Sequence, residues 1–184
     1  MIVDDLFFRA LIGAVFLLAT VTKFRSEMAR AEVARAVRVM LAVSPRFARI
    51  AARAGLALEA LVVGLVAVPA TGTIGLALAA SLLAGYTAVL AAGLARGRRV
   101  ACQCFGTDGD VIRMKHIVRN GLLTLLAGGG AVISTDSRSF ASSRDLIALA
   151  AGLVVGWLAT RWDDLAYLLS GVLSRNAPST APPR

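Results

Sequence analysis

The chain has 184 residues, of which 58% are hydrophobic and only 17% are charged. Soluble domains carry about 25% charged residues, so this composition excludes an ordinary soluble domain and indicates an integral membrane protein. The formal net charge of +9 would raise the question of nucleic-acid binding in a soluble chain. Here the basic residues are not interleaved with aromatic residues that could stack on bases. Because anionic lipid headgroups account for the charge, we expect membrane lipids as partners and no nucleic acid.

Five apolar segments have the character of membrane spans. They cover residues 6–22, 54–68, 73–95, 116–134 and 146–160. The third segment is the clearest, because it has 23 uncharged residues and a span needs about 20. Backbone polar groups inside lipid must be hydrogen-bonded within their own segment, so each segment should be an α-helix. We predict an all-α fold, a polytopic transmembrane helical bundle of four core helices followed by a fifth.

A basic stretch over residues 23–53 separates the first two spans. Val33, Val37, Met40 and Leu41 in this stretch share one face of a helix. The pattern predicts an amphipathic helix at the membrane interface, and a plain solvated helix is the alternative. The dipeptide Ser44-Pro45 is expected to end that helix before the second span.

The distribution of basic residues predicts the orientation. The connection 23–53 carries eight Lys or Arg residues, and the connection 96–119 carries six. Basic connections stay in the cytoplasm, so five helices would place the N-terminus outside and the C-terminus inside. Residues 136–173 are expected to hold the fifth helix and an interfacial segment with Trp157, Trp162 and Tyr167. Residues 174–184, which are rich in proline, are predicted to be a disordered tail.

The only two cysteines of the chain, Cys102 and Cys104, lie one residue apart in the polar loop 96–115. In an extended segment, residues i and i+2 point to the same side, with Cα atoms about 6–7 Å apart, near the upper limit for a disulfide. Strained disulfides are the labile, catalytic ones, and the basic residues of the loop would favour the thiolate. The pair therefore predicts thiol–disulfide chemistry, and an inert pair is the alternative.

A metal site is the other chemistry open to this loop. His116, Asp108 and Asp110 could add ligands to the two cysteines. A structural zinc site needs four ligands, mostly Cys or His, and one histidine does not complete such a set. We therefore predict no metal site, and we expect His116 to be an interfacial or capping residue.

The residues around the cysteines resemble a known family. The run Ala95-Arg-Gly-Arg-Arg-Val-Ala-Cys-Gln-Cys-Phe-Gly106, followed by His116-Ile-Val-Arg-Asn-Gly-Leu-Leu123, is similar to the MauE family. The resemblance covers residues 1–135 and includes Phe16, Lys23-Phe24 and Glu59. Gln103 departs from it, because this position is often Gly in the family. The fifth helix and the tail lie outside the resemblance.

This resemblance implies a multi-pass protein of the bacterial inner membrane, distantly similar to DoxX-type bundles. It also implies a role in methylamine utilisation, in maturation of the methylamine dehydrogenase small subunit or a similar disulfide-containing client, with a thioredoxin-like partner. The chain would then be a membrane thiol–disulfide oxidoreductase or electron relay, with Cys102 and Cys104 as its catalytic residues. Quinone at the other end of the relay is a further expectation, for which the sequence has no binding motif. The alternative is a non-enzymatic assembly factor or small transporter subunit, with structural or metal-binding cysteines.

Five other residues are candidates for supporting roles. Glu59 lies inside a predicted span, where a charge costs about 2.5–3.5 kcal/mol on insertion scales. We expect it to face protein, paired with Arg9 or Arg119, and proton transfer and simple snorkelling are both open to it. Arg119 and Asn120 could order the cysteine loop, or anchor a helix start at the interface. Phe105 and Gly106 complete the loop motif.

The predicted orientation conflicts with the predicted chemistry. Charge places the cysteine loop in the cytoplasm, whereas disulfides persist outside it. A relay that accepts electrons on the cytoplasmic side would remove the conflict, and so would a different topology.

Overall fold

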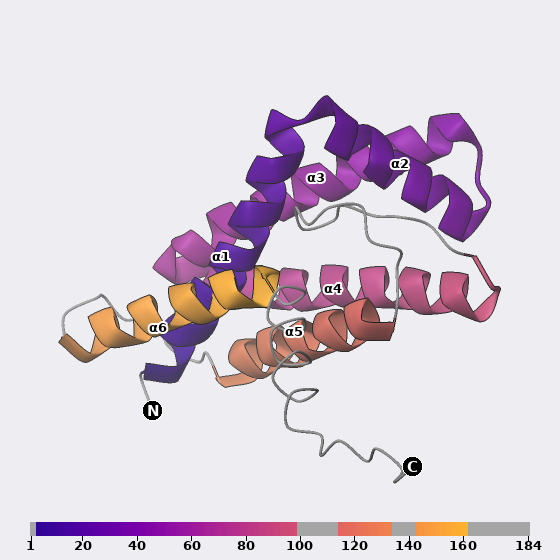
Figure 1. The fold of residues 1–184 in the computed structure, drawn as a ribbon. Helices are drawn as coiled ribbons and strands as arrows, with labels where there is room; N and C mark the ends of the chain where they lie inside the picture. Colours follow the sequence, from indigo (N-terminus) through magenta and orange to yellow (C-terminus); the bar gives the residue numbers. More distant parts are fainter. Residues whose placement is uncertain (1–2, 99–113, 134–142, 162–184) are drawn as a thin grey trace, which may run out of the picture.

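The computed structural model describes residues 3–98, 114–133 and 143–161. Over these ranges the chain forms helices and no strands (Figure 1). The helices are α1 (Val3–Arg25), α2 (Glu27–Leu41), α3 (Pro45–Ala67), the short 3-10 helix η1 (Pro69–Thr71), α4 (Gly72–Ala95), α5 (Met114–Ile133) and α6 (Ser143–Thr160). The predicted all-α fold is confirmed.

Five of these helices are long and apolar enough to cross a membrane: α1, α3, α4 together with η1, α5 and α6. The turn between the second and third spans is formed by η1. The predicted start of the second span is wrong, because α3 begins at Pro45 and not near residue 54. Ser44 caps this helix by accepting a hydrogen bond from the Phe47 amide at 3.3 Å. The basic residues that precede the apolar run are therefore helical as well.

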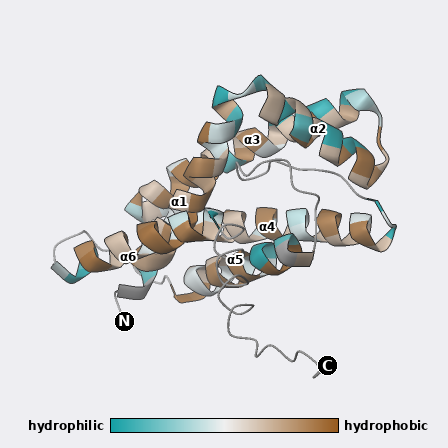
Figure 2. Cartoon of the chain, in the orientation of Figure 1, coloured by the Kyte–Doolittle hydropathy of each residue, from teal (hydrophilic) through white to brown (hydrophobic). Residues whose placement is uncertain are grey.

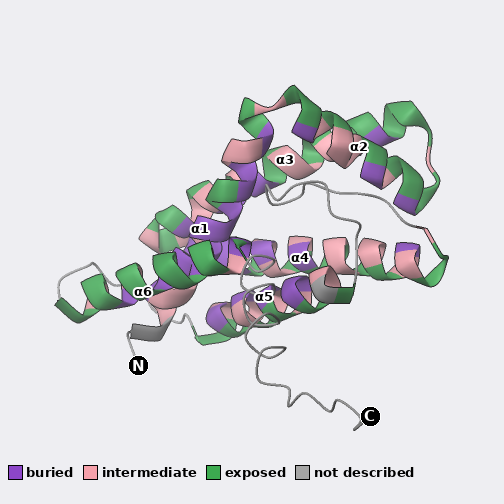
Figure 3. Cartoon of the chain, in the orientation of Figure 1, coloured by how far each residue is buried: buried purple, intermediate pink, exposed green. Residues whose placement is uncertain are grey.

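Helix α1 lies at the centre of the bundle and contacts α3, α5 and α6. Leu11, Ile12, Val15 and Phe16 of this helix are almost fully buried, and Figure 3 shows the buried positions concentrated along it. The outer faces of the spans carry exposed large apolar side chains, among them Leu61, Ile74, Leu125, Val132 and Ile147. Such faces are suited to contact with lipid.

Helix α6 packs against α1 through two glycines. A Cβ added to Gly152 would lie 2.5 Å from the carbonyl oxygen of Phe7, and one added to Gly156 would lie 2.6 Å from that of Leu11. Small residues four positions apart allow this close approach of membrane helices. The fifth predicted helix is therefore an integral part of the bundle.

Helix α2 is the least apolar element, and Figure 2 shows hydrophilic residues gathered on it. Ser26 caps its start by accepting a hydrogen bond from the Ala29 amide at 3.1 Å. Arg30 donates to the carbonyl oxygens of Lys23 and Phe24 at the end of α1, at 3.0 and 2.9 Å, and so fixes the turn between the helices. The buried side of α2 packs against α3 and α4.

Candidate functional site

Glu59, near the middle of α3, is only 3% exposed. The ammonium group of Lys23, in the last turn of α1, donates to both carboxylate oxygens at 2.6 and 2.7 Å. The hydroxyl group of Tyr86, in α4, donates to Oε1 at 3.0 Å. We call these three residues the Glu59 cluster. The prediction that Glu59 faces protein is confirmed, and the snorkelling alternative is wrong because the carboxylate is enclosed by three helices.

The predicted partners of Glu59 are corrected by this geometry. Arg9 lies near the opposite end of α1, where its Nε and NH2 groups donate to the carbonyl oxygen of Val66 at 3.0 and 2.9 Å. Its guanidinium also lies 3.6 Å from the carboxylate of Asp5. Arg9 therefore caps the C-terminal end of α3. The ion pair of Glu59 is formed with Lys23 in place of Arg119.

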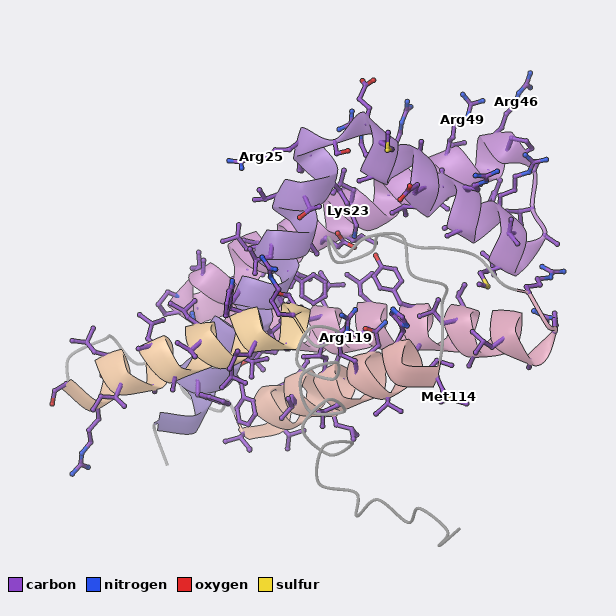
Figure 4. The ribbon with its side chains drawn as sticks, in the orientation of Figure 1. Lys23, Arg25, Arg46, Arg49, Met114 and Arg119 are labelled. Atoms are coloured by element: carbon purple, nitrogen blue, oxygen red, sulfur yellow. The ribbon has the colours of Figure 1, made fainter. Side chains whose placement is uncertain are left out.

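The Glu59 cluster lines a cavity of about 250 Å³ between the helices. Its lining residues come from α1 to α5: Lys23, Val33, Ala36, Val37, Met40, Leu41, Ala51, Ala52, Gly55, Leu56, Glu59, Tyr86, Val89, Leu90, His116, Arg119 and Asn120. Figure 4 shows Lys23 and Arg119 on the inner side of the bundle, whereas Arg25, Arg46 and Arg49 extend away from it. Apolar side chains thus form most of the wall, and the polar groups are concentrated on α1, α3, α4 and α5.

The apolar face predicted for α2 forms one wall of this cavity. All four residues of that face, Val33, Val37, Met40 and Leu41, line it. The apolar face of α2 therefore helps to enclose the cavity, because α2 packs against α3 and α4.

Asn120 and Arg119 lie in the second turn of α5 and are 3% and 6% exposed. Asn120 Oδ1 is buried and has no hydrogen-bond partner within the described part of the chain. Both residues reach the cavity, so the predicted alternative of a helix-start anchor at the membrane surface does not account for them. Their predicted role in ordering the cysteine loop stays a prediction.

The segment with the candidate catalytic residues Cys102 and Cys104, and with Phe105 and Gly106, lies outside the described residues. Described residues near its two ends either contact a helix that lines the cavity or line the cavity themselves. Arg98, after α4, donates to the carbonyl oxygens of Val39 and Met40 at 2.6 and 2.9 Å. On the other side, His116 in the first turn of α5 lines the cavity.

Within the ranges 3–98, 114–133 and 143–161, no three His, Cys, Asp or Glu side chains gather as metal ligands would. The cysteines, Asp108 and Asp110 lie outside these ranges. The structure therefore does not test whether the loop binds a metal. His116 is a cavity residue.

Sequence reasoning missed the parts played by Lys23 and Tyr86. In the sequence, Lys23 stands out only as one of the residues shared with the family, and Tyr86 does not stand out. Two signals could have found them: a lysine directly after an apolar segment, and the single tyrosine inside an uncharged span. Both are polar groups at membrane depth, where such groups find polar partners.

The family model described as "Methylamine utilisation protein MauE" matches residues 3–133. The matched region includes α1 to α5, the Glu59 cluster and both cysteines, whereas α6 lies beyond it. Neither the curated proteins nor the solved structures yield a match to this chain. The family match covers well over half of the chain, and four of the five candidate spans lie within it. This multi-pass membrane protein therefore belongs to the MauE family of methylamine utilisation proteins.

Proposed function

We propose that this protein carries out thiol–disulfide exchange in the bacterial inner membrane and so supports the maturation of a disulfide-containing client. Cys102 and Cys104 form the exchanging pair. The observation that carries the proposal is their isolation: they are the only cysteines of the chain, one residue apart, within the region that matches the family. By family resemblance the client is the methylamine dehydrogenase small subunit or a similar redox protein.

The chemistry requires a second dithiol protein. A thiolate of a thioredoxin-like partner attacks one sulfur of the Cys102–Cys104 disulfide and forms a mixed disulfide. The second thiolate of the partner then attacks the partner's sulfur atom in the mixed disulfide, and the bond to this chain breaks. The partner leaves as a disulfide and the pair as two thiols, with two electrons transferred. The oxidised partner can then take two electrons from a client dithiol, which forms the client's disulfide.

Chain connectivity supports an exchange close to the cavity. Cys102 follows Arg98 by four residues, and a fully extended chain spans at most about 3.6 Å per residue. The Cα atom of Cys102 is therefore within about 14 Å of that of Arg98. Arg98 itself is held by hydrogen bonds to the last turn of α2, which lines the cavity.

Single cysteine variants test the exchange. To trap the adduct, each variant is combined with a thioredoxin-like partner that keeps only one of its two cysteines. Neither Cys102→Ser nor Cys104→Ser then meets a thiol that could resolve a mixed disulfide, so one of the two variants should accumulate a covalent adduct with that partner. The adduct is detected on non-reducing gels and disappears on reduction. Maturation of the client, assayed as its active form, should fall by at least about tenfold in each variant, because the two thiols act as one unit.

The double variant Cys102→Ser/Cys104→Ser is the matched control, which should form no adduct. Full client maturation in both single variants, without any adduct, would contradict the proposal and favour a non-enzymatic assembly factor. Loss of bound copper or zinc in step with each substitution would contradict it as well, because the cysteines would then be metal ligands.

A further inference from the structure

The cavity combines an apolar wall with buried hydrogen-bonding groups. Its volume of about 250 Å³ exceeds the roughly 150 Å³ in which an engineered apolar cavity holds benzene. A substituted six-membered ring therefore fits. Leu56 of α3 and Val89 and Leu90 of α4 belong to the apolar wall, and the helices that carry them also have lipid-suited outer faces. The occupant should accordingly be soluble in the membrane.

The polar groups of the cavity include both donors and acceptors. The Lys23 ammonium and the Tyr86 hydroxyl are donors, and both bind the Glu59 carboxylate. Asn120 is 97% buried, and its side-chain oxygen has no hydrogen-bond partner among the described residues. Buried polar atoms almost always have a partner. An unsatisfied amide oxygen in a cavity wall is therefore an independent sign that a hydrogen-bonding ligand belongs there.

The redox chemistry of the cysteine pair narrows the class of ligand. A quinone ring is flat and apolar, and its carbonyl oxygens accept hydrogen bonds from groups such as an ammonium, a hydroxyl or an amide. The reduced quinol instead donates hydrogen bonds, for which a carboxylate or an amide oxygen is the acceptor. Both states find partners among Lys23, Glu59, Tyr86 and Asn120. An acyl chain would leave the Asn120 side-chain oxygen unsatisfied.

We infer that the cavity between α2, α3, α4 and α5 binds the head group of a membrane quinone, held by the Glu59 cluster and Asn120. In its redox part this inference rests on the proposed thiol–disulfide exchange. The two thiols of the pair lose two electrons and two protons as their S–S bond forms. The quinone gains them as its two carbonyl groups become hydroxyl groups. The quinone is thus the oxidant that regenerates the disulfide.

Binding is tested on the full chain in detergent with a short-chain ubiquinone and its photoreactive azido analogue. We expect saturable binding, with cross-links on α2 to α5. Tyr86→Phe and Asn120→Leu each remove one hydrogen-bonding group, which should weaken binding by about three- to tenfold. Val37→Trp fills the cavity from α2 without altering a polar group, and should abolish binding. Ser81→Ala is the matched control, because Ser81 is exposed on α4, does not line the cavity and donates its hydrogen bond to the Ala77 carbonyl oxygen of its own helix.

Thermal unfolding of each variant shows whether it is folded. If Val37→Trp fails to fold, the two conservative variants still decide the question. Absence of saturable binding, cross-links elsewhere, or equal binding by all folded variants would overturn the inference. So would displacement of the analogue by a fatty acid at the same concentration.

The variant Cys102→Ser/Cys104→Ser separates the two proposals, because it should bind the quinone as the natural chain does. Quinone binding to a chain whose thiols do not exchange would refute the proposed function alone. Thiol exchange with a partner protein in a chain that binds no quinone would refute this inference alone.

Discussion

The Glu59 carboxylate shows how a single residue constrains a membrane protein. A charge inside the bilayer is costly, and Glu59 is kept there by the ammonium group of Lys23 and the hydroxyl group of Tyr86. The pair links α1 to α3, and the hydroxyl adds α4. Because all three groups also line the cavity, the same contacts that hold the helices together define the polar part of the site.

Removing one member of the ion pair should destabilise the fold. Lys23→Met or Glu59→Gln leaves the other charge buried without its partner, at an expected cost of about 3–5 kcal/mol in the free energy of unfolding. The double variant should lose clearly less than the sum of the two single variants, because no uncompensated charge remains. Denaturant unfolding in detergent measures all three.

Arg46→Met is the control for this cycle, since Arg46 lies exposed on α3 away from the cavity. Its free energy of unfolding should change by no more than about 0.5 kcal/mol. Strict additivity of the Lys23 and Glu59 variants would show that the two charges do not stabilise each other.

At the scale of helices, α6 approaches α1 closely because two residues of α6 at the contact are glycines, which have no side chain. Gly152 and Gly156 bring the backbone of α6 against carbonyl oxygens of α1. Association of helices in lipid depends on such packing, because lipid tails are as apolar as leucine. The helix that lies beyond the family match is thus attached to the central helix of the bundle.

Gly156→Ala should separate these two helices. The added Cβ would meet the Leu11 carbonyl oxygen and the Ala14 side chain, so we expect a loss of about 1–3 kcal/mol in the free energy of unfolding. Gly85→Ala on α4 is the matched control, since nothing lies within 4 Å of the added atom. It should be neutral or stabilising by up to about 1 kcal/mol, because alanine favours helix. Equal effects of the two substitutions in thermal unfolding would contradict the close packing.

The sequence was sufficient for the parts of the fold that depend on local composition. An uncharged run over residues 73–95 predicts a helix that the structure shows as Gly72–Ala95, because lipid demands a hydrogen-bonded backbone. Burial of Glu59 follows from the cost of a charge in hydrocarbon. The ion-pair partner of Glu59 cannot be predicted in the same way. The choice among Arg9, Arg119 and Lys23 depends on the rotation of each helix about its axis and on the depth of each residue along the bundle.

The start of α3 and the packing partner of α6 are harder to predict from the sequence. Arg46, Arg49 and Arg53 interrupt the apolar pattern, so a hydropathy criterion starts the span too late, whereas the helix begins at Pro45, directly after its cap Ser44. Gly152 and Gly156 form a small-residue pair that indicates a helix contact. Which helix they contact depends on the tertiary fold. The cavity arises only once α2 is placed across α3 and α4.

The molecule as a whole is polarised from one end to the other. Helix α2 and the cavity lie towards the end of the bundle at which Lys23 and Arg98 are found, and η1 lies at the other end of α3 and α4. Positive connections remain in the cytoplasm. This rule predicts η1 outside and Arg98, the last described residue before the cysteines, inside. The proposed oxidation of a client requires the cysteine pair on the outside, so the two expectations oppose each other.

Thiol labelling with a membrane-impermeant reagent tests this orientation. In intact cells, whose outer barriers admit the reagent as far as the inner membrane, Cys102 should react only after that membrane is permeabilised. The matched control is Ala70→Cys in a chain without Cys102 and Cys104, because Ala70 is exposed in η1 and should be labelled in intact cells. Labelling of Cys102 in intact cells would reverse the orientation and place the pair on the side where disulfides persist.

The central claim is that Cys102 and Cys104 are a reversible redox pair, and a redox titration of the purified chain tests it most directly. The protein is equilibrated in buffers of graded thiol–disulfide potential, and free thiols are trapped with a mass-shifting reagent. We expect two mass shifts to appear together over one transition that fits a two-electron couple, in which about 30 mV changes the ratio tenfold. Thiols that stay reduced, or stay oxidised, at every accessible potential would contradict the claim.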